Sequence, residues 1–316
     1  MSPFSGKDIN SILNNSCTYI GDETLVFTDC RPILEARQSD LTWIRPGIKK
    51  AEYYINNSKA GGIICDQKTL NLFSGVLKDI FFIISENPLL SFTRILKKQV
   101  VEDIQIKEGF IHSTAIIHPG CKIGKDVRIG AYSIIDAADI GDYTTISNNV
   151  RIYNKVSIGN RCEIREFCSI GGPGFGIVKD EVGNNIPVPH IGNVRIGNGV
   201  LIFPFSNVDK GMLGDTVIED NVAIDHYCHI GHNTFTGSNT IITAGVILAG
   251  GAKIQNNCFL GVRTIVKEKI EVGANATTGM GAVVTNNIPD LQTWVGNPAC
   301  EIGAFIKQRE FIKKNI

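Results

Sequence analysis

Aliphatic residues or threonine recur at every sixth position of this chain, without a break, from Ile218 to Val284. Small or β-branched residues, such as Val222 and Ala252, stand four places after many of them. An amphipathic helix repeats every 3.6 residues and a half-buried strand every two, so neither produces this spacing. The sixth-position residues, which we call anchor residues, are Ile218, Ile224, Ile230, Thr236, Ile242, Leu248, Ile254, Leu260, Val266, Val272, Thr278 and Val284.

A period of six is typical of the hexapeptide class of parallel β-helix, in which three hexapeptides form one triangular coil. The anchor residue of each hexapeptide points into the prism. Residues 18 apart in the sequence then lie one above the other, at about 4.8 Å, like neighbouring strands. The repeat therefore predicts a mostly β fold and converts sequence spacing into spatial distance.

The same repeat occurs earlier in the chain and is interrupted at residues 171–190 and 210–215. These interruptions predict loops that leave a continuous prism, and loops on a rigid scaffold commonly carry substrate contacts. The earlier anchor residues are Ile111, Ile117, Ile123, Ile129, Ile140, Ile146, Ile152, Ile158, Ile164 and Ile170.

Three segments are predicted from where the repeat begins and ends. Residues 1–105 lack it and form an N-terminal α/β domain, residues 106–290 form the β-helix, and residues 291–316 form a C-terminal segment. The elements expected in the first segment are a helix at Ser5–Asn14, buried strands at Gly62–Cys65 and Asp79–Ser85, and an amphipathic helix at Pro88–Lys98.

The C-terminal segment has apolar residues at helical spacing and a basic character over Phe305–Lys314. One interpretation is a cap on the last coil, because solenoids need caps. The other is a cationic contact for an acidic acyl carrier protein. The two are compatible.

The chain has 316 residues, of which 43% are hydrophobic, and a formal net charge of zero. This balance provides no basic surface for nucleic acid. With no leader peptide and no apolar run near the roughly 18 residues of a membrane span, we expect a cytoplasmic protein. Five of the nine cysteines fall on inward positions and are expected to be small core residues; they are Cys121, Cys162, Cys168, Cys228 and Cys258.

Three histidines cluster at His226, His229 and His232. His226 and His232 have the same position in successive hexapeptides and so belong to different faces of the prism, with His229 expected near a corner. They cannot share one metal ion unless a neighbouring subunit supplies ligands. No metal is therefore expected within one chain.

His232 is a candidate catalytic base because Gly250 follows it by 18 residues. A peptide N–H without a side chain then lies one coil above the imidazole. Histidine can take a proton from an attacking amine, while the amide stabilises the oxyanion of acyl transfer. The alternative is that His232 only fills a corner position.

Asn233 and Asp225 are further polar candidates near His232. Asn233 is predicted to orient the ring or bind substrate, or else to be a turn residue. Asp225 is a weaker candidate for substrate binding, with a turn-forming or solvated carboxylate as the alternative.

Four runs closely resemble the UDP-3-O-acylglucosamine N-acyltransferases, a lipid A family that transfers a hydroxyacyl chain from acyl carrier protein. They are SIGGPGFG (169–176), PHIGNVRIGNGV (189–200), NVDKGMLGDTVIEDNVAID (207–225) and HIGHN (229–233). In the N-terminal segment, SENPLLSFTRIL (85–96) is similar to a helix of that family. LTWIRP (41–46) stands in the place of its uridine-binding stretch.

This resemblance implies a left-handed β-helix that forms a homotrimer, with active sites between prisms. It implies that His232 is the base and that Gly250 supplies the oxyanion amide. No bound cofactor is needed, and the co-substrate is an acyl thioester of acyl carrier protein or coenzyme A. The other residues it assigns to substrate binding are Trp43, Phe175, Gly176, Asp209 and Lys210.

The chain departs from the family pattern at several places. Glu268 and Lys269 replace a Gly-His pair, Lys210 replaces an arginine, and VGNPA (295–299) is more typical of small acetyltransferases. Trp43 replaces a phenylalanine and can still stack on a pyrimidine, or else fill the core.

The function predicted from the sequence is N-acyl transfer to a nucleotide-linked amino sugar. An alternative is transfer of a short acyl or acetyl group to an amino sugar of a surface polysaccharide. Two alternatives of other classes are a trimeric zinc hydratase and a non-catalytic scaffold that binds sugar nucleotides.

Overall fold

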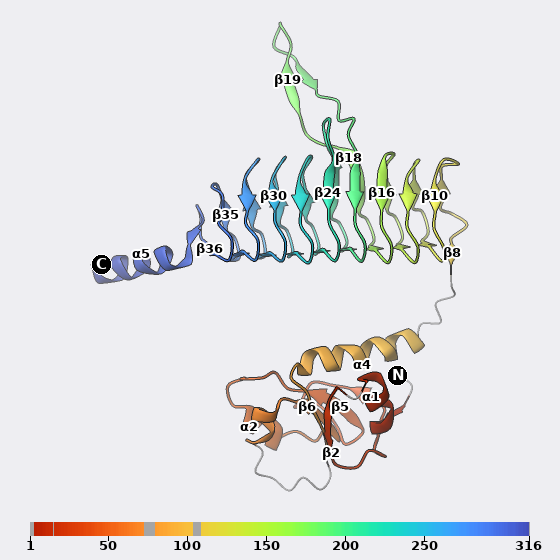
Figure 1. Cartoon of the computed structure of the whole chain (residues 1–316), viewed down its shortest axis with the longest axis vertical. Helices are drawn as coiled ribbons and strands as arrows, with labels where there is room; N and C mark the ends of the chain where they lie inside the picture. Colours follow the sequence, from red (N-terminus) through yellow and green to blue (C-terminus); the bar gives the residue numbers. More distant parts are fainter. Residues whose placement is uncertain (1–2, 15, 73–79, 104–108, 316) are drawn as a thin grey trace. The chain divides into compact units, whose positions relative to one another are not determined.

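The computed structural model describes residues 3–14, 16–72, 80–103 and 109–315. The chain divides into two compact units, residues 1–106 and residues 107–316 (Figure 1), which we call the head and the prism. The domain boundary predicted between residues 105 and 106 falls in 104–108, outside the described residues.

The head contains one five-stranded sheet in the order β2-β7-β6-β5-β4. β2 runs antiparallel to β7, and the other neighbours are parallel. The central strands β6 and β7 are buried along their whole length, which accounts for their unbroken sequences GIIC and FFII. The strands of the head, with the small pair β1 and β3, are β1 (Phe4–Ser5), β2 (Thr18–Ile20), β3 (Val26–Phe27), β4 (Asp29–Cys30), β5 (Asp40–Trp43), β6 (Gly62–Cys65) and β7 (Phe81–Ile84).

The helices of the head pack against its sheet in two hydrophobic cores. Ile9 and Ile95 pack with Leu41 and Ile64 in one core, and Ile55 packs in the other. The strand predicted at Gly62–Cys65 and the helices predicted near Ser5–Asn14 and Pro88–Lys98 are confirmed. The helices are α1 (Gly6–Ile12), α2 (Ala51–Asn56), α3 (Gln67–Leu70) and α4 (Pro88–Asp103).

Three parallel sheets form the faces of the prism (Figure 1). The eight-stranded face consists of β10 (Lys122–Ile123), β13 (Asp139–Ile140), β16 (Val156–Ile158), β21 (Val194–Ile196), β24 (Thr216–Ile218), β27 (Phe235–Thr236), β30 (Lys253–Ile254) and β33 (Glu271–Val272). The nine-stranded face consists of β9 (Ile116–Ile117), β12 (Ile134–Ile135), β15 (Arg151–Ile152), β18 (Ser169–Pro173), β23 (Asn207–Lys210), β26 (His229–Ile230), β29 (Ile247–Leu248), β32 (Ile265–Val266) and β35 (Val283–Val284).

The eleven-stranded face completes the triangle and carries the last two strands. It consists of β8 (Phe110–Ile111), β11 (Arg128–Ile129), β14 (Thr145–Ile146), β17 (Glu163–Ile164), β22 (Leu201–Ile202), β25 (Ala223–Ile224), β28 (Ile241–Ile242), β31 (Phe259–Leu260), β34 (Thr277–Thr278), β36 (Thr293–Val295) and β37 (Cys300–Glu301). β37 runs antiparallel to β36 and leads into α5 (Ile302–Asn315), which has no buried residue.

The register between strands follows the 18-residue step. Ile230 pairs with Leu248, and Leu248 pairs with Val266. All three side chains are fully buried in one continuous core. Each anchor therefore lies above the one before it, as the repeat predicts.

Two insertions leave the prism, where the repeat is interrupted. The first carries an antiparallel hairpin, β19 (Ile177–Lys179) and β20 (Asn185–Pro187), which projects from the prism in Figure 1. The second is a short turn between β23 and β24. Most other corners turn through a residue with positive φ three places after the anchor, such as Asn233 at φ 59° or Tyr227 at φ 59°.

The fold class predicted from the sequence is confirmed: a left-handed parallel β-helix with an N-terminal α/β unit and a short C-terminal helix. All nine cysteines are free, and four of the five placed on inward positions are buried. Among the described helices, none combines the length and the apolar character needed to cross a bilayer.

The inward orientation of the anchors can be tested within one strand. Ile254 in β30 is fully buried, and its neighbour Lys253 is exposed. Replacing a core isoleucine by alanine costs about 2–5 kcal/mol, so we expect Ile254→Ala to lower the free energy of unfolding by that amount in urea titrations. The matched control Lys253→Ala should change it by less than about 0.5 kcal/mol. Equal losses in the two variants would contradict this orientation.

Candidate active site

His232 and Gly250 occupy the same place on successive coils of the nine-stranded face. Each lies two residues after an anchor, and these anchors, Ile230 and Leu248, are paired in register. A Cβ atom on Gly250 would lie 2.5 Å from His232 Nε2 and 2.6 Å from Cε1. The structure thus brings the two residues together, with the imidazole over the bare face of the glycine.

Position 250 must be a glycine because a side chain there would collide with the imidazole of His232, and not because of its backbone conformation. Ala244 holds the same repeat position on the preceding corner, where it also follows an anchor, Ile242, by two residues. Gly250 is absent from the glycines with positive φ. A side chain would therefore fit the backbone at this position but would collide with His232.

Two peptide N–H groups at this corner lack a hydrogen-bond acceptor within the part of the chain that the structure describes. After the eight-stranded face, the equivalent N–H donates to a side chain of the next coil, as Asp142 N–H does to Asn160 Oδ1 at 2.7 Å. Above His232 the next coil offers only Gly250, which has no side chain. The N–H groups of His232 and Gly250 both remain available to an external acceptor.

Asn233 determines which nitrogen of His232 carries the proton. Asn233 Oδ1 accepts a hydrogen bond from the Met212 N–H at 2.9 Å and lies 3.1 Å from His232 Nδ1. Because this oxygen can only accept, the hydrogen-bond network assigns the proton to Nδ1. Nε2, the atom nearest the Cβ position of Gly250, then carries a lone pair. Asn233 is therefore both a left-handed turn residue and the residue that orients the ring.

A second imidazole, that of His190, packs against His232 and is not among the site residues predicted from the sequence. The rings of His190 and His232 meet edge to face, with centroids 4.9 Å apart. His190 Nδ1 lies 2.9 Å from the Val188 carbonyl oxygen and donates to it, and the buried Nε2 has no partner among the described residues. A Cβ on Gly174 would lie 2.8 Å from both His190 Nε2 and His232 Cβ. His190 lies in an insertion outside the 18-residue register, so spacing could not place it.

Asp209 is a partly buried carboxylate on the strand below His232. Its Oδ1 accepts from Asn207 Nδ2 at 3.1 Å, and its Oδ2 lies 3.9 Å from His229 Nε2. Burial raises the pKa of this carboxyl above its ordinary value, against the opposing effects of His229, Asn207, His232 and His190. The prediction that His229 lies near a corner is wrong, because the residue before an anchor points outward from the middle of a strand, here β26.

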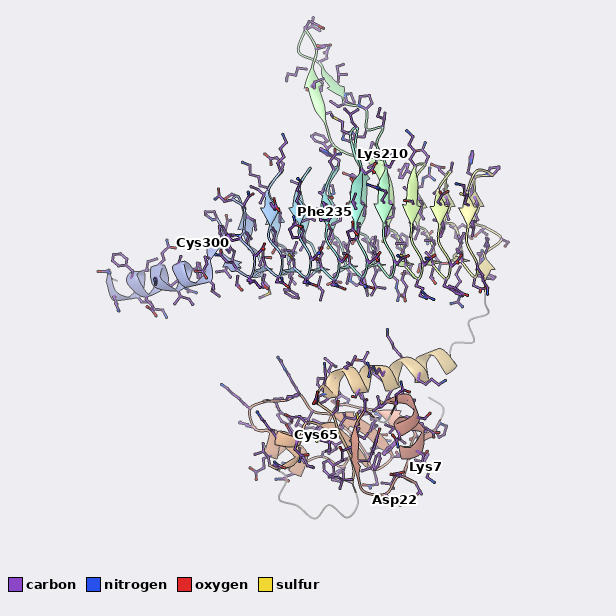
Figure 2. All side chains as sticks on the ribbon, viewed as in Figure 1. Lys7, Asp22, Cys65, Lys210, Phe235 and Cys300 are labelled. Carbon is purple, nitrogen blue, oxygen red and sulfur yellow. The ribbon has the colours of Figure 1, made fainter. Side chains whose placement is uncertain are left out.

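Lys210 is buried beside this carboxylate, at the point where the hairpin leaves the prism (Figure 2). Its Nζ donates to Asn154 Oδ1 at 3.0 Å. Burial lowers the pKa of this ammonium, and Lys155 lowers it further. A cavity of about 470 Å³ lies along the same edge and is lined by Ala137, Ala138, Asp139, Asn154, Lys155, Val156, Ser157, Asn193 and Arg195.

Phe175 and Gly176 lie in the first insertion, on the side of His190. Gly176 is packed so closely that a Cβ would lie 3.2 Å from Val188 Cβ and 3.3 Å from His190 Cε1. Phe175 is 85% exposed. Gly176 therefore packs against Val188 and His190, whereas the exposed Phe175 side chain is free to contact a ligand or partner.

Asp225 is not gathered with His232 in one chain. It lies at the corner after the eleven-stranded face, where its Oδ1 is 2.6 Å from His226 Nδ1. Partial burial acts to raise the pKa of this carboxyl, but the hydrogen bonds and charge of His226 bring it below its ordinary value. A common site with His232 would need a second protomer.

Trp43 ends β5 in the head and is half-buried. Its ring is tilted at 32° against Phe92, with centroids 6.3 Å apart. It borders a cavity of about 360 Å³ lined by Cys30, Arg31, Pro32, Ile33, Thr42, Phe92 and Leu96. One part of the indole thus fills the core, and another faces a space that can admit a planar ligand.

No group of three or more histidine, cysteine, aspartate or glutamate side chains is arranged to hold a metal ion among the residues described. His226 points away from this site toward Asp225, as the different face predicted for it requires.

Comparison with known proteins defines the class to which this fold and site belong. The hexapeptide repeat of succinyl-transferases matches residues 120–154, 228–257 and 251–286. A UDP-N-acetylglucosamine acyltransferase from Campylobacter jejuni is 26% identical, with a TM-score of 0.54 over 60% of this chain and 73% of that one. LpxA from Acinetobacter baumannii is 25% identical, with a TM-score of 0.55 over 63% and 77%. The chain thus contains hexapeptide repeats, and its β-helix is similar to those of these acyltransferases.

Its similarity to one group within this class is more specific. A probable UDP-3-O-acylglucosamine N-acyltransferase 2 of Arabidopsis thaliana is 35% identical over 139 residues, which are 44% of this chain and 46% of the relative. A UDP-3-O-acylglucosamine N-acyltransferase of Caulobacter sp. is 30% identical over 145 residues, 46% and 42%. The predicted resemblance to these N-acyltransferases is confirmed. The chain spans less than half the length of either relative.

A double-mutant cycle tests whether the imidazole occupies the space over Gly250. The Cβ of Gly250→Ala would displace the ring, so this variant should be less stable than the wild type. In the His232→Ala background the space is empty, and Gly250→Ala should be nearly neutral. We expect a coupling free energy of about 0.5–3 kcal/mol between the two positions in urea titrations. Additive effects would show that the ring lies elsewhere.

Proposed function

We propose that this protein transfers an acyl group from an acyl thioester to the amino group of a nucleotide-linked amino sugar. The observation that carries the proposal is the contact between the free Nε2 of His232 and Gly250, with unpaired peptide N–H groups at the same corner. The similarity to UDP-3-O-acylglucosamine N-acyltransferases supports it.

The reaction needs no covalent intermediate on the protein. The amine of the sugar attacks the thioester carbonyl while His232 Nε2 takes a proton from the nitrogen. An oxyanion forms on the former carbonyl oxygen and accepts hydrogen bonds from the Gly250 and His232 N–H groups. When the C–S bond breaks, the imidazolium returns the proton to the departing thiolate. The products are an amide and a free thiol.

We propose that cationic residues away from the reacting atoms bind the nucleotide phosphates. Lys155, Lys210 and Arg195 lie along the edge of the prism on the side of the preceding coils, and cationic side chains suit phosphates. For the head, taken by itself, we propose that the indole face of Trp43 stacks on a pyrimidine base. In the first insertion, Gly176 and Phe175 are proposed to border the sugar and the acyl chain.

The acyl donor is proposed to be a thioester of acyl carrier protein or coenzyme A, both found in the cytoplasm. The exposed α5 presents Lys307, Arg309, Lys313 and Lys314, which suit the acidic surface of a carrier protein. A homotrimer, as the resemblance implies, would place Asp225 of one protomer toward the cleft beside another prism. No cofactor takes part in this reaction.

The decisive experiment offers the pure protein a panel of nucleotide-linked amino sugars with acyl carrier protein and coenzyme A thioesters of different chain lengths. Mass spectrometry of the products identifies the amide. An acetyl or short hydroxyacyl product would favour the polysaccharide alternative over a lipid A intermediate. Stoichiometric zinc together with hydration of a substrate would instead favour the hydratase, and binding without turnover would favour the scaffold.

Replacing the proposed base should abolish turnover without affecting the fold. General-base catalysis contributes about 10²- to 10⁴-fold, so we expect His232→Ala to lower kcat by that factor while nucleotide binding and circular dichroism stay unchanged. His118→Ala, several coils away, is the matched control and should retain wild-type kcat. Wild-type turnover in His232→Ala would exclude this residue as the base.

The proposed base also predicts the pH dependence of the reaction. An imidazole must be neutral to accept a proton, so a histidine base loses activity once the medium is acidic enough to protonate it. We therefore expect kcat/KM to fall as the pH is lowered and to level off at higher pH. A profile of kcat/KM that stays flat down to pH 5 would argue against a histidine base.

A further inference from the structure

Asp209 occupies an unusual position among three imidazoles. It lies in β23, which pairs with β26 so that Asn207 is opposite His229 and Val208 is opposite Ile230. The next residue of this segment, Gly231, faces the following coil, since a Cβ there would lie 2.6 Å from the Leu248 carbonyl oxygen and 3.0 Å from the Gly250 nitrogen. His229 and His232 flank Ile230 and Gly231, so the pairing of β23 with β26 brings both histidines near Asp209.

The carboxylate is held in this space by its own contacts. Asn207 Nδ2 donates to Oδ1 at 3.1 Å, and the same asparagine contacts His229 Nδ1 at 2.9 Å. His229 Nε2 lies 3.9 Å from Oδ2. The third imidazole, His190, closes the site from the first insertion by its edge contact with His232.

In the proposed reaction His232 becomes positively charged when it accepts a proton, whereas the hydrogen-bonding partner of its ring, Asn233, stays neutral. Asn233 fixes Nδ1 through a neutral amide oxygen, which orients the ring but adds no counter-charge. His190 Nδ1 donates to the Val188 carbonyl oxygen, and its buried Nε2 has no partner among the described residues, so this ring provides no negative counter-charge for His232. The nearby positive charge, Lys210, is turned to Asn154. Among the groups facing His232, Asp209 is the one that can balance an imidazolium.

We propose that Asp209 is a positioning residue that stabilises the protonated form of His232 through space, from the neighbouring strand β23. The inference rests on the proposed function, in which His232 is protonated in the tetrahedral intermediate. It also gives Asp209 a different task from the substrate contact that the resemblance implies. Burial raises the pKa of Asp209, and His229, Asn207, His232 and His190 act in the opposite direction.

The effect on His232 can be measured without substrate. Diethyl pyrocarbonate modifies neutral imidazole, so the pH dependence of its reaction with the His232 peptide, followed by mass spectrometry on the full chain, reports when this ring takes up a proton. Removing a neighbouring negative charge makes protonation harder. We therefore expect Asp209→Asn to move the midpoint of this profile to lower pH by at least about 0.5 unit, since an opposite charge nearby favours the charged form.

Two further variants make the result specific. Asp209→Glu keeps the charge and should restore the midpoint to near the wild-type value. Glu219→Gln removes a carboxylate at the same repeat position on the adjacent face and should leave the midpoint unchanged. If Asp209→Asn does not fold, Asp209→Ser, which also lacks the charge, is measured in its place.

Kinetics separate this proposal from substrate binding. In Asp209→Asn the acidic limb of kcat/KM should move to lower pH in parallel with the modification profile. We also expect kcat to fall about tenfold, as the loss of roughly 1.4 kcal/mol of transition-state stabilisation would require, with KM for the sugar unchanged. A raised KM with an unmoved modification midpoint would overturn the proposal and assign Asp209 to substrate.

Failure of the proposed function has a different signature. If no thioester and amino sugar of the panel gives turnover, acyl transfer is wrong, whatever the modification profile shows. A midpoint that still shifts in Asp209→Asn would then leave the pairing of Asp209 with His232 standing. An unshifted midpoint in an active wild-type enzyme would overturn the pairing alone.

Discussion

The hydrogen-bonded register between stacked strands is the constraint on which the rest of the structure depends. Each anchor residue must lie above the anchor 18 residues before it, because a shifted strand would turn its apolar residue outward. Ile230 under Leu248, and Leu248 under Val266, show this alignment in the coils that carry the site. The contact of His232 with Gly250 follows from that alignment.

Function arises where this regular prism lacks a side chain. At several other corners an asparagine or aspartate of the next coil accepts a hydrogen bond from the equivalent N–H, as Asn256 does from Ser238. At the His232 corner, Gly250 leaves room for an imidazole and leaves the amides unpaired. The missing side chain at Gly250 thus leaves a place on the ladder of strands where a proton and a negative charge can be accommodated.

The elements that could be predicted from the sequence are those within the repeat. The three faces and the stacking of His232 with Gly250 follow from counting residues, because the coil length is constant. His190 could not be placed in this way, since the insertion that carries it has no fixed relation to the register. His229 was misplaced because its position next to an anchor puts it in mid-strand. The space beside Trp43 depends on how α4 packs on the sheet, which no local pattern specifies.

The location of β26 within its sheet has a consequence for how the molecule loses order. Three strands lie beyond it on one side and five on the other. In a solenoid each coil is supported only by its two neighbours, so fraying starts at the termini and proceeds inward. The coil that holds the imidazole is then among the last to melt, and partial loss of either end would leave it shielded.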